Sequence, residues 1–276
     1  HIQAFRIAEE LSNPVMVCMD GFLLTHASER VDLPEQDQVD AFLPPYVPRQ
    51  VLDPDDPVSI GAMVGPEAFT EVRYLGYERM RQALELIPAV EADFGAQFGR
   101  GSGGLLKLYR TDDADLIVVA LGSVLGTVKD AIDELRGDGM RVGALGITTF
   151  RPFPAQAVRD ALGDDDRLRR LVVLERSLAP GSGGVVTADL RAALATGDGG
   201  PRDAIVSTVI AGLGGRPVTR DSLRRMLTSA ARGALPAFSF LDLDMGLVEG
   251  ELTRIRAARR SGPTAENILR DLVGRA

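Results

Sequence analysis

Residues 116–147 read LIVVALGSVLGTVKDAIDELRGDGMRVGALGI, and this stretch decides the fold. Two continuous apolar runs, 116–121 and 142–147, have the length and composition of strands that are buried on both faces. Between them, a segment from Thr127 to about Arg136 has the apolar spacing of an amphipathic helix. A strand, a helix and a strand in this order predict a right-handed crossover between two parallel strands.

The same alternation of strand and helix continues along the chain. The further elements that the pattern predicts are strands at 171–174 and 205–210 and helices at 154–162, 184–194 and 219–226. Apolar strands separated by amphipathic helices are typical of an α/β fold in which helices cover both faces of a parallel sheet. After about Arg232 the pattern changes, and the sequence predicts a tail of two helices, at 244–259 and 264–273.

Residues 1–100 follow a different pattern, with one convincing strand. An amphipathic helix opens the chain and stops at Asn13-Pro14, and the apolar run from Val15 to Met19 is predicted to be a short buried strand. A second helical region runs from about Pro66 to Phe98 and is expected to break or bend near Pro88. Cys18 lies inside the apolar run, so we expect it to be an inert buried residue.

A single strand cannot form a stable sheet, because stable sheets need three or more strands. The strands that would complete the first part must therefore lie upstream of His1 or belong to another chain. Of these two possibilities, we favour a missing upstream half.

Composition excludes several classes of function. The chain has 276 residues with 31 Lys plus Arg against 39 Asp plus Glu, a formal net charge of −8, so nucleic acid is not an expected partner. One cysteine and two histidines argue against an internal disulfide, an iron–sulfur cluster and a zinc site. No apolar run approaches the roughly 20 residues needed to cross a bilayer, so we expect a soluble cytoplasmic protein without membrane contact.

The loop from Asp20 to His26 is the best local candidate for a site. It follows the carboxyl end of the predicted strand at 15–19, and open α/β sheets place their ligand crevices at such ends. Asp20 and Gly21 would bring a carboxylate and an accessible backbone there, and Thr25 and His26 would add hydrogen-bonding groups. The alternative is an ordinary turn, because Asp-Gly sequences favour turns.

Two glycine clusters also follow predicted strands. Gly181-Ser182-Gly183-Gly184 precedes a helix, so its amides could bind the phosphate groups of an anion such as CoA, or the glycines could form a tight turn. The cluster from Gly212 to Arg216 is interpreted as a turn at a strand end, with Arg216 facing a neighbouring subunit.

Several motifs together resemble the α subunit of pyruvate:ferredoxin oxidoreductase. They occur in the family order and cover residues 1 to about 230. The motifs are HIQAFRIAE at 1–9, PVMVCMDGFLLTH at 14–26, VDAFLPPY at 39–46, YRTDDAD at 109–115, FRPFP at 150–154 and GLGGR at 212–216.

The resemblance implies a thiamine-diphosphate enzyme that cleaves a 2-oxoacid, most often pyruvate, to an acyl-CoA and CO₂, and passes electrons to ferredoxin. It implies three parts: the C-terminal half of a pyrimidine-side domain (1–104), a transketolase C-terminal-like domain (105–231) and a helical tail (232–276). A β subunit would share the thiamine diphosphate and its Mg²⁺. The further partners would be γ and ferredoxin-like δ subunits, and [4Fe-4S] clusters would lie in partner subunits. The family's cofactor-activating glutamate belongs to the front half of the first domain, which is absent here, so no catalytic residue is assigned.

Two alternatives remain open at this point. The first is a related subunit that acts on aryl or branched 2-oxoacids. The second is a non-catalytic α/β scaffold subunit that retains the fold without the active half.

Overall fold

The computed structural model describes residues 1–21, 23–61, 63–163, 168–196, 199–201, 203–259 and 262–274. The chain separates into two compact units, His1–Ser239 and Phe240–Ala276. The first unit holds a cluster of helices and a sheet, and the second is a pair of helices.

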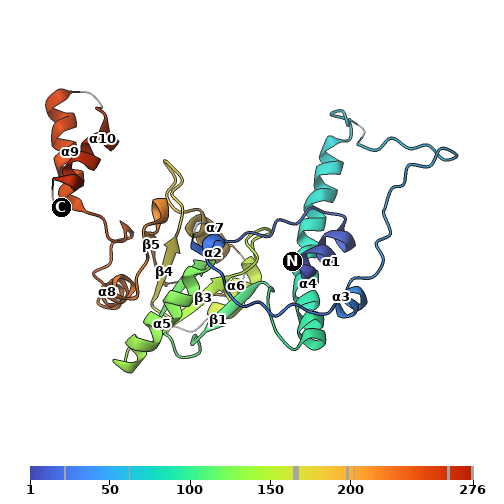
Figure 1. Cartoon of the computed structure of the whole chain (residues 1–276), viewed down its shortest axis with the longest axis horizontal. Helices are drawn as coiled ribbons and strands as arrows, with labels where there is room; N and C mark the ends of the chain where they lie inside the picture. The colour runs from blue at the N-terminus through green and yellow to red at the C-terminus, as the bar shows by residue number, and fades with distance from the viewer. Residues whose placement is uncertain are drawn as a thin grey trace. The chain divides into compact units, whose positions relative to one another are not determined.

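The sheet has six strands in the order β1-β3-β2-β4-β5-β6. Strands β1, β3, β4 and β5 are labelled in Figure 1. The bounds of the six strands are β1 Leu106–Tyr109, β2 Leu116–Leu121, β3 Val142–Ile147, β4 Arg170–Glu175, β5 Ile205–Ile210 and β6 Phe238–Phe240. Strand β2 is parallel to β3 and β4, and β4 is parallel to β5, whereas the edge strand β1 is antiparallel to β3. The mostly parallel α/β sheet expected from the sequence is confirmed, and β1 and β6 are two edge strands that the apolar pattern did not reveal.

Four helices cover the sheet. They are α5 Val124–Gly137, α6 Ala155–Leu162, α7 Val185–Ala195 and α8 Arg220–Ala231. Helices α5 and α8 contact each other on one face, and α6 and α7 contact each other on the opposite face. Because side chains alternate along a strand, Ile117 and Val119 of β2 lie in the core with Val158 of α6 and Leu190 of α7.

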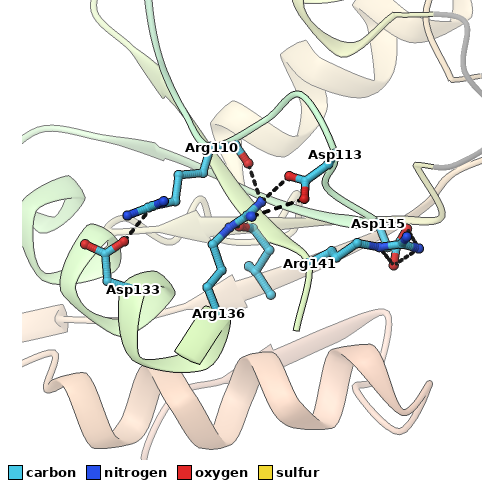
Figure 2. A network of polar contacts seen from close by, with 7 residues as sticks. Arg110, Asp113, Asp115, Asp133, Arg136 and Arg141 are labelled. Carbon is cyan, nitrogen blue, oxygen red and sulfur yellow. Dashed lines mark hydrogen bonds and ion pairs between the residues drawn. The ribbon is translucent and has the colours of Figure 1, made fainter. Parts of the chain in front are cut away.

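A network of charged side chains lies at the amino end of β2 and β3 (Figure 2). The Arg136 side chain donates to the backbone oxygens of Arg110 and Val142 at 2.8 and 2.7 Å and forms an ion pair with Asp113. Arg141 pairs with Asp115 at 2.7 Å. The hydrogen bond from Arg136 lowers the pKa of Asp113. These contacts fix the connection between β1 and β2, so we interpret the network as structural.

In the first hundred residues, the described regular elements are all helices. The helices are α1 Ile2–Leu11, α2 Leu23–His26, α3 Gln36–Phe42 and α4 Phe69–Phe98. A small core joins α1, α3 and α4 through Ile7, Phe42, Val90 and Phe94. Helix α4 continues through Pro88, so the expectation of a break is wrong, whereas the alternative, a bend, stays a prediction. Its residues on either side of the proline, Ile87 and Val90, are buried in this core, which holds the helix together across the missing amide.

The predicted strand from Val15 to Met19 is also wrong. In the described residues between 1 and 100 no strand forms, and the Met16 and Met19 side chains are 86% and 65% exposed. Apolar residues adopt a strand only where a partner strand supplies the hydrogen bonds, and the described chain brings none to this segment. For the same reason Cys18 is an exposed free thiol and not the buried residue that we expected.

The second unit contains the two predicted tail helices. They are α9 Met245–Ala258 and α10 Thr264–Val273. Among the described residues, every helix is too short or too polar to span a membrane.

Candidate functional site

The direction in which the chain crosses from strand to strand reverses between the neighbouring strands β2 and β4. From β2 the chain crosses to β3 on one side, and from β3 it crosses back to β4 on the other side. The helices that follow β2 and β4, α5 and α7, therefore lie on opposite faces of the sheet. In open α/β sheets the carboxyl ends of the strands at such a reversal are where ligands bind.

Asp20 lies at this position. Its carboxylate oxygen Oδ2 accepts a hydrogen bond from the backbone amide of Ser123 at 2.9 Å and another from the Ser123 hydroxyl. The Arg176 guanidinium lies 3.3 Å from the same oxygen. Ser123 immediately precedes α5 and Arg176 immediately follows β4. The Asp20 carboxylate therefore contacts residues at the carboxyl ends of both β2 and β4.

The Asp20 carboxylate is charged at neutral pH. The hydrogen bond from the Ser123 hydroxyl lowers the pKa of Asp20, and partial burial opposes this shift. The Ser123 amide and the charge of Arg176 lower that pKa further. The contact is therefore a charge-assisted one, which is stronger than a hydrogen bond between neutral groups.

The loop from Gly212 to Arg216 lies beside Arg176. A Cβ atom placed on Gly212 would lie 3.3 Å from Arg176 Nε, and Gly212 has φ +69°. Arg216 is exposed at the end of this loop. Gly21, Thr25 and His26 are exposed as well, and the Thr25 hydroxyl lies 3.4 Å from His26 Nδ1 in the short helix α2. Asp20, which was singled out from the sequence, thus reaches the ends of both β2 and β4.

A second carboxylate occupies the amino end of α7. Glu175, the last residue of β4, is 1% exposed and accepts hydrogen bonds from the Thr187 amide at 2.6 Å and the Thr187 hydroxyl at 2.9 Å. A Cβ atom on Gly184 would lie 2.2 Å from Glu175 Oε1. The amino end of α7 therefore already holds an anionic group of the chain itself. This favours the turn interpretation of Gly181–Gly184 over binding of phosphate or CoA.

Ser123, Glu175 and Arg176 were not identified from the sequence. Each directly follows a predicted strand or lies one residue beyond it, and polar residues at such ends are the signal that could have indicated them. The sequence predicts a helix that begins at Thr127, whereas α5 begins at Val124, so the prediction leaves Ser123 well before the helix.

We expect Asp20→Ala to release the segment from Ser12 to Gly21 while the sheet stays folded. The lost bonds are worth about 1 kcal/mol after screening of a partly exposed pair, which corresponds to roughly fivefold faster amide exchange in this segment. Amide hydrogen exchange measured by mass spectrometry would test this. Asp32→Ala is the matched control, because Asp32 is exposed and its one ion pair among the described residues is with nearby Arg30.

The same contact should depend on pH in a defined direction. Because the folded pKa of Asp20 lies below its unfolded value of about 3.9, the contribution to stability is present above that value. It is lost as the pH falls through the folded pKa. Equal exchange rates in wild type and Asp20→Ala, at neutral and acidic pH, would contradict the anchoring role.

The described surface also has two depressions beside charged residues. No group of three or more His, Cys, Asp or Glu side chains among the described residues could hold a metal ion. A depression of about 390 Å³ lies beside Arg6 and Phe42, and another of about 270 Å³ lies beside Glu134 and Arg224. Neither is lined by Asp20 or Glu175.

Two family models match the chain one after the other. Residues 1–92 match the thiamine-diphosphate-binding model of pyruvate flavodoxin/ferredoxin oxidoreductase, and residues 114–223 match core domain II of pyruvate:ferredoxin oxidoreductase. The second match coincides with the part of the chain that forms β2 to β5 and their helices.

Curated relatives extend these matches. Pyruvate synthase subunit PorA of Methanosarcina barkeri is 37% identical over 87% of this chain and 60% of its own length. The same subunit of Methanothermobacter thermautotrophicus is 38% identical over 78% of this chain and 54% of its own length. Ketoisovalerate oxidoreductase subunit VorA of Pyrococcus abyssi is 34% identical over 81% of this chain and 55% of its own length. The chain thus spans little more than half the length of these relatives.

A solved structure is also similar, at lower identity. It is the 2-oxoglutarate:ferredoxin oxidoreductase from Magnetococcus marinus with 2-oxoglutarate, coenzyme A and succinyl-CoA bound. The TM-score is 0.42 and the identity 14%, over 69% of this chain and 29% of that chain. On the two family models and the PorA relatives, this chain is an α-subunit-like protein of the pyruvate:ferredoxin oxidoreductase family.

Proposed function

We propose that this chain works as the α subunit of a 2-oxoacid:ferredoxin oxidoreductase that converts pyruvate and CoA to acetyl-CoA and CO₂. Electrons would pass to ferredoxin, and the complex would act in the cytoplasm. The observation that carries this proposal is the match of two consecutive domain models of one family, in order along the chain. The names of the PorA relatives support pyruvate as the substrate.

The described residues do not fit the diphosphate of thiamine diphosphate or its Mg²⁺. They contain no cluster of carboxylates that could hold a metal ion, and the amino ends of α5 and α7 already contact Asp20 and Glu175. One cysteine in the whole chain cannot ligate a [4Fe-4S] cluster. We therefore place the diphosphate, Mg²⁺ and the clusters on partner subunits of the β, γ and δ types, and assign no catalytic residue to this chain.

The N-terminal part supports a role that requires partner subunits. Large apolar side chains are exposed along the segment that joins α1 to α4, and exposed apolar surface of this extent favours contact with another protein. The most exposed of them are Met16, Leu33, Val47, Leu52 and Met63. We propose that partner subunits cover this surface and that Asp20 fixes the position of the segment against the sheet.

A second candidate substrate is a branched 2-oxoacid such as ketoisovalerate. The observation in its favour is the VorA relative, whose identity to this chain is only slightly lower than that of the PorA relatives. The side chains that contact the substrate would decide between the two acids, and none of the described residues is assigned to that contact.

The experiment uses the native complex purified through this chain. Pyruvate or ketoisovalerate is mixed with CoA and an artificial one-electron dye, and dye reduction is followed. Reduction should require CoA, should be lost when thiamine diphosphate is removed, and should be faster with pyruvate. A complex that contains no thiamine diphosphate and no iron–sulfur protein would overturn the proposal and would support the scaffold alternative.

A further inference from the structure

The second unit, Phe240–Ala276, lies outside both family models. Within it, α9 and α10 form a hairpin (Figure 1), and polar side chains of the two helices contact each other. Glu251 is 4% exposed and accepts a hydrogen bond from Asn267 at 3.1 Å, and Arg254 pairs with Asp271 at 2.7 Å. These contacts settle which side of α9 faces α10.

A different stripe of α9 is left uncovered. The stripe consists of Met245, Glu249, Leu252 and Arg256, at alternating spacings of four and three, and Arg259, the residue that caps the helix, continues the series. This is the spacing by which one helix packs along another. Met245 is 50% exposed and Leu252 is 41% exposed, so the described residues of the second unit do not cover the apolar members of the stripe.

The apolar face of α10 is uncovered as well. Leu269 is 62% exposed, Leu272 is 46% exposed and Val273 is 78% exposed. No residue of α10 is buried. A pair of short helices that leaves this much apolar surface in water is expected to associate with a further helical surface.

The charges along the α9 stripe indicate which partner helix would pack against it. Glu249 lies in the first half of the stripe, whereas Arg256 and Arg259 lie in the second half. Neither Glu249 nor Arg256 forms an ion pair with another described residue. They are seven residues apart, or roughly 10 Å along the helix axis, which is too far for a direct pair within one helix.

A second α9 in antiparallel orientation would place an arginine opposite each Glu249. A parallel copy would instead place Glu249 against Glu249 and Arg256 against Arg256. Like charges that face each other are unfavourable, so the stripe is complementary to itself in one orientation only.

We propose that α9 pairs with α9 of a second copy of this chain, antiparallel, with Leu252 close to the two-fold axis. Leu252 of the two copies would be in contact, and Glu249 of each copy would pair with Arg256 of the other. Such an interface is isologous, because the same patch is used by both copies. The inference does not depend on the proposed enzymatic activity.

Disulfide cross-linking of the full chain tests the orientation directly, because Cys18 is the only cysteine. In a Cys18→Ser background, Leu252→Cys should form a cross-linked dimer under mild oxidation. Met245→Cys alone should not, because two copies of residue 245 would lie roughly 20 Å apart in the antiparallel pair. A mixture of the Met245→Cys chain and an Arg259→Cys chain should cross-link.

Charge reversal gives an independent readout by sedimentation velocity. Glu249→Arg and Arg256→Glu should each weaken the dimer roughly tenfold, and the double variant should restore it. Equal cross-linking of Leu252→Cys and Met245→Cys would mean a parallel pair and would overturn the proposal. Absence of cross-linking at Leu252 would also overturn it and would mean that another protein covers this stripe.

Discussion

Gly143→Ala is expected to lower the free energy of unfolding of the sheet by about 2–3 kcal/mol, the upper part of the range for overpacked sites. Gly143 lies in β3, and a Cβ atom there would be 2.5 Å from the backbone oxygen of Arg110. It would also lie 3.1 Å from Thr111 Cα. These are backbone atoms, which cannot rotate away as a side chain could. The Arg110 oxygen is further held by the 2.8 Å hydrogen bond from Arg136 (Figure 2).

Gly126→Ala is the matched control for the same chemical change. Gly126 lies in α5, and a Cβ atom there would have no neighbour within 4 Å. Alanine in a helix is favoured over glycine by about 0.5–1 kcal/mol, so this variant should be more stable than wild type. Urea unfolding followed by far-ultraviolet circular dichroism measures both changes. A Gly143→Ala variant as stable as wild type would show that β3 and the loop at Arg110 are not packed as described.

The central strands could be predicted from the sequence because they are buried on both faces. Three of the apolar runs, 116–121, 142–147 and 205–210, coincide with β2, β3 and β5. The edge strand β1 was missed because it alternates Leu with Lys and Tyr over four residues and is only partly buried. A short, half-exposed strand has no continuous apolar run to indicate it.

The strand predicted at Val15 to Met19 was wrong for a different reason. This run is as apolar as a buried strand, but a strand also needs a neighbour, and whether one exists depends on residues far away in the chain. Composition cannot supply that information, so the same apolar pattern is buried at 116–121 and exposed at 15–19.

Only part of the candidate site could be predicted, because the contacts of Asp20 also depend on residues far away in the sequence. Asp20 could be singled out as a polar residue after an apolar run, although that run is not a strand. Its partners could not be identified, because Ser123 and Arg176 are 103 and 156 residues away in the sequence. The predicted strand at 171–174 also ended one residue early, which left Glu175 outside the sheet and concealed its burial.

Glu175→Ala is expected to have an effect of about 3–4 kcal/mol on the free energy of unfolding. The variant leaves the Thr187 amide and hydroxyl without their acceptor in a buried place, at about 1–3 kcal/mol for each unpaired group. It also leaves a cavity beside Gly184, because the carboxylate now fills the space where a Cβ would lie. The Thr208 hydroxyl donates to the Thr187 hydroxyl at 3.2 Å, which in turn donates to Glu175. The variant removes the final acceptor of this series of hydrogen bonds.

Glu175→Gln separates the loss of hydrogen bonds from the loss of charge. The glutamine keeps the shape of the side chain and one acceptor oxygen for the Thr187 amide, so this variant should lose only about 1 kcal/mol. A double-mutant cycle with Thr187→Val isolates the contact: Glu175→Ala and Thr187→Val should show a coupling energy of at least about 1 kcal/mol in urea unfolding. If Glu175→Ala and Glu175→Gln were equally stable, the carboxylate would not be acting as the acceptor at the amino end of α7. That end of the helix would then again be available to an external anion, and the interpretation of Gly181–Gly184 as a simple turn would fail with it.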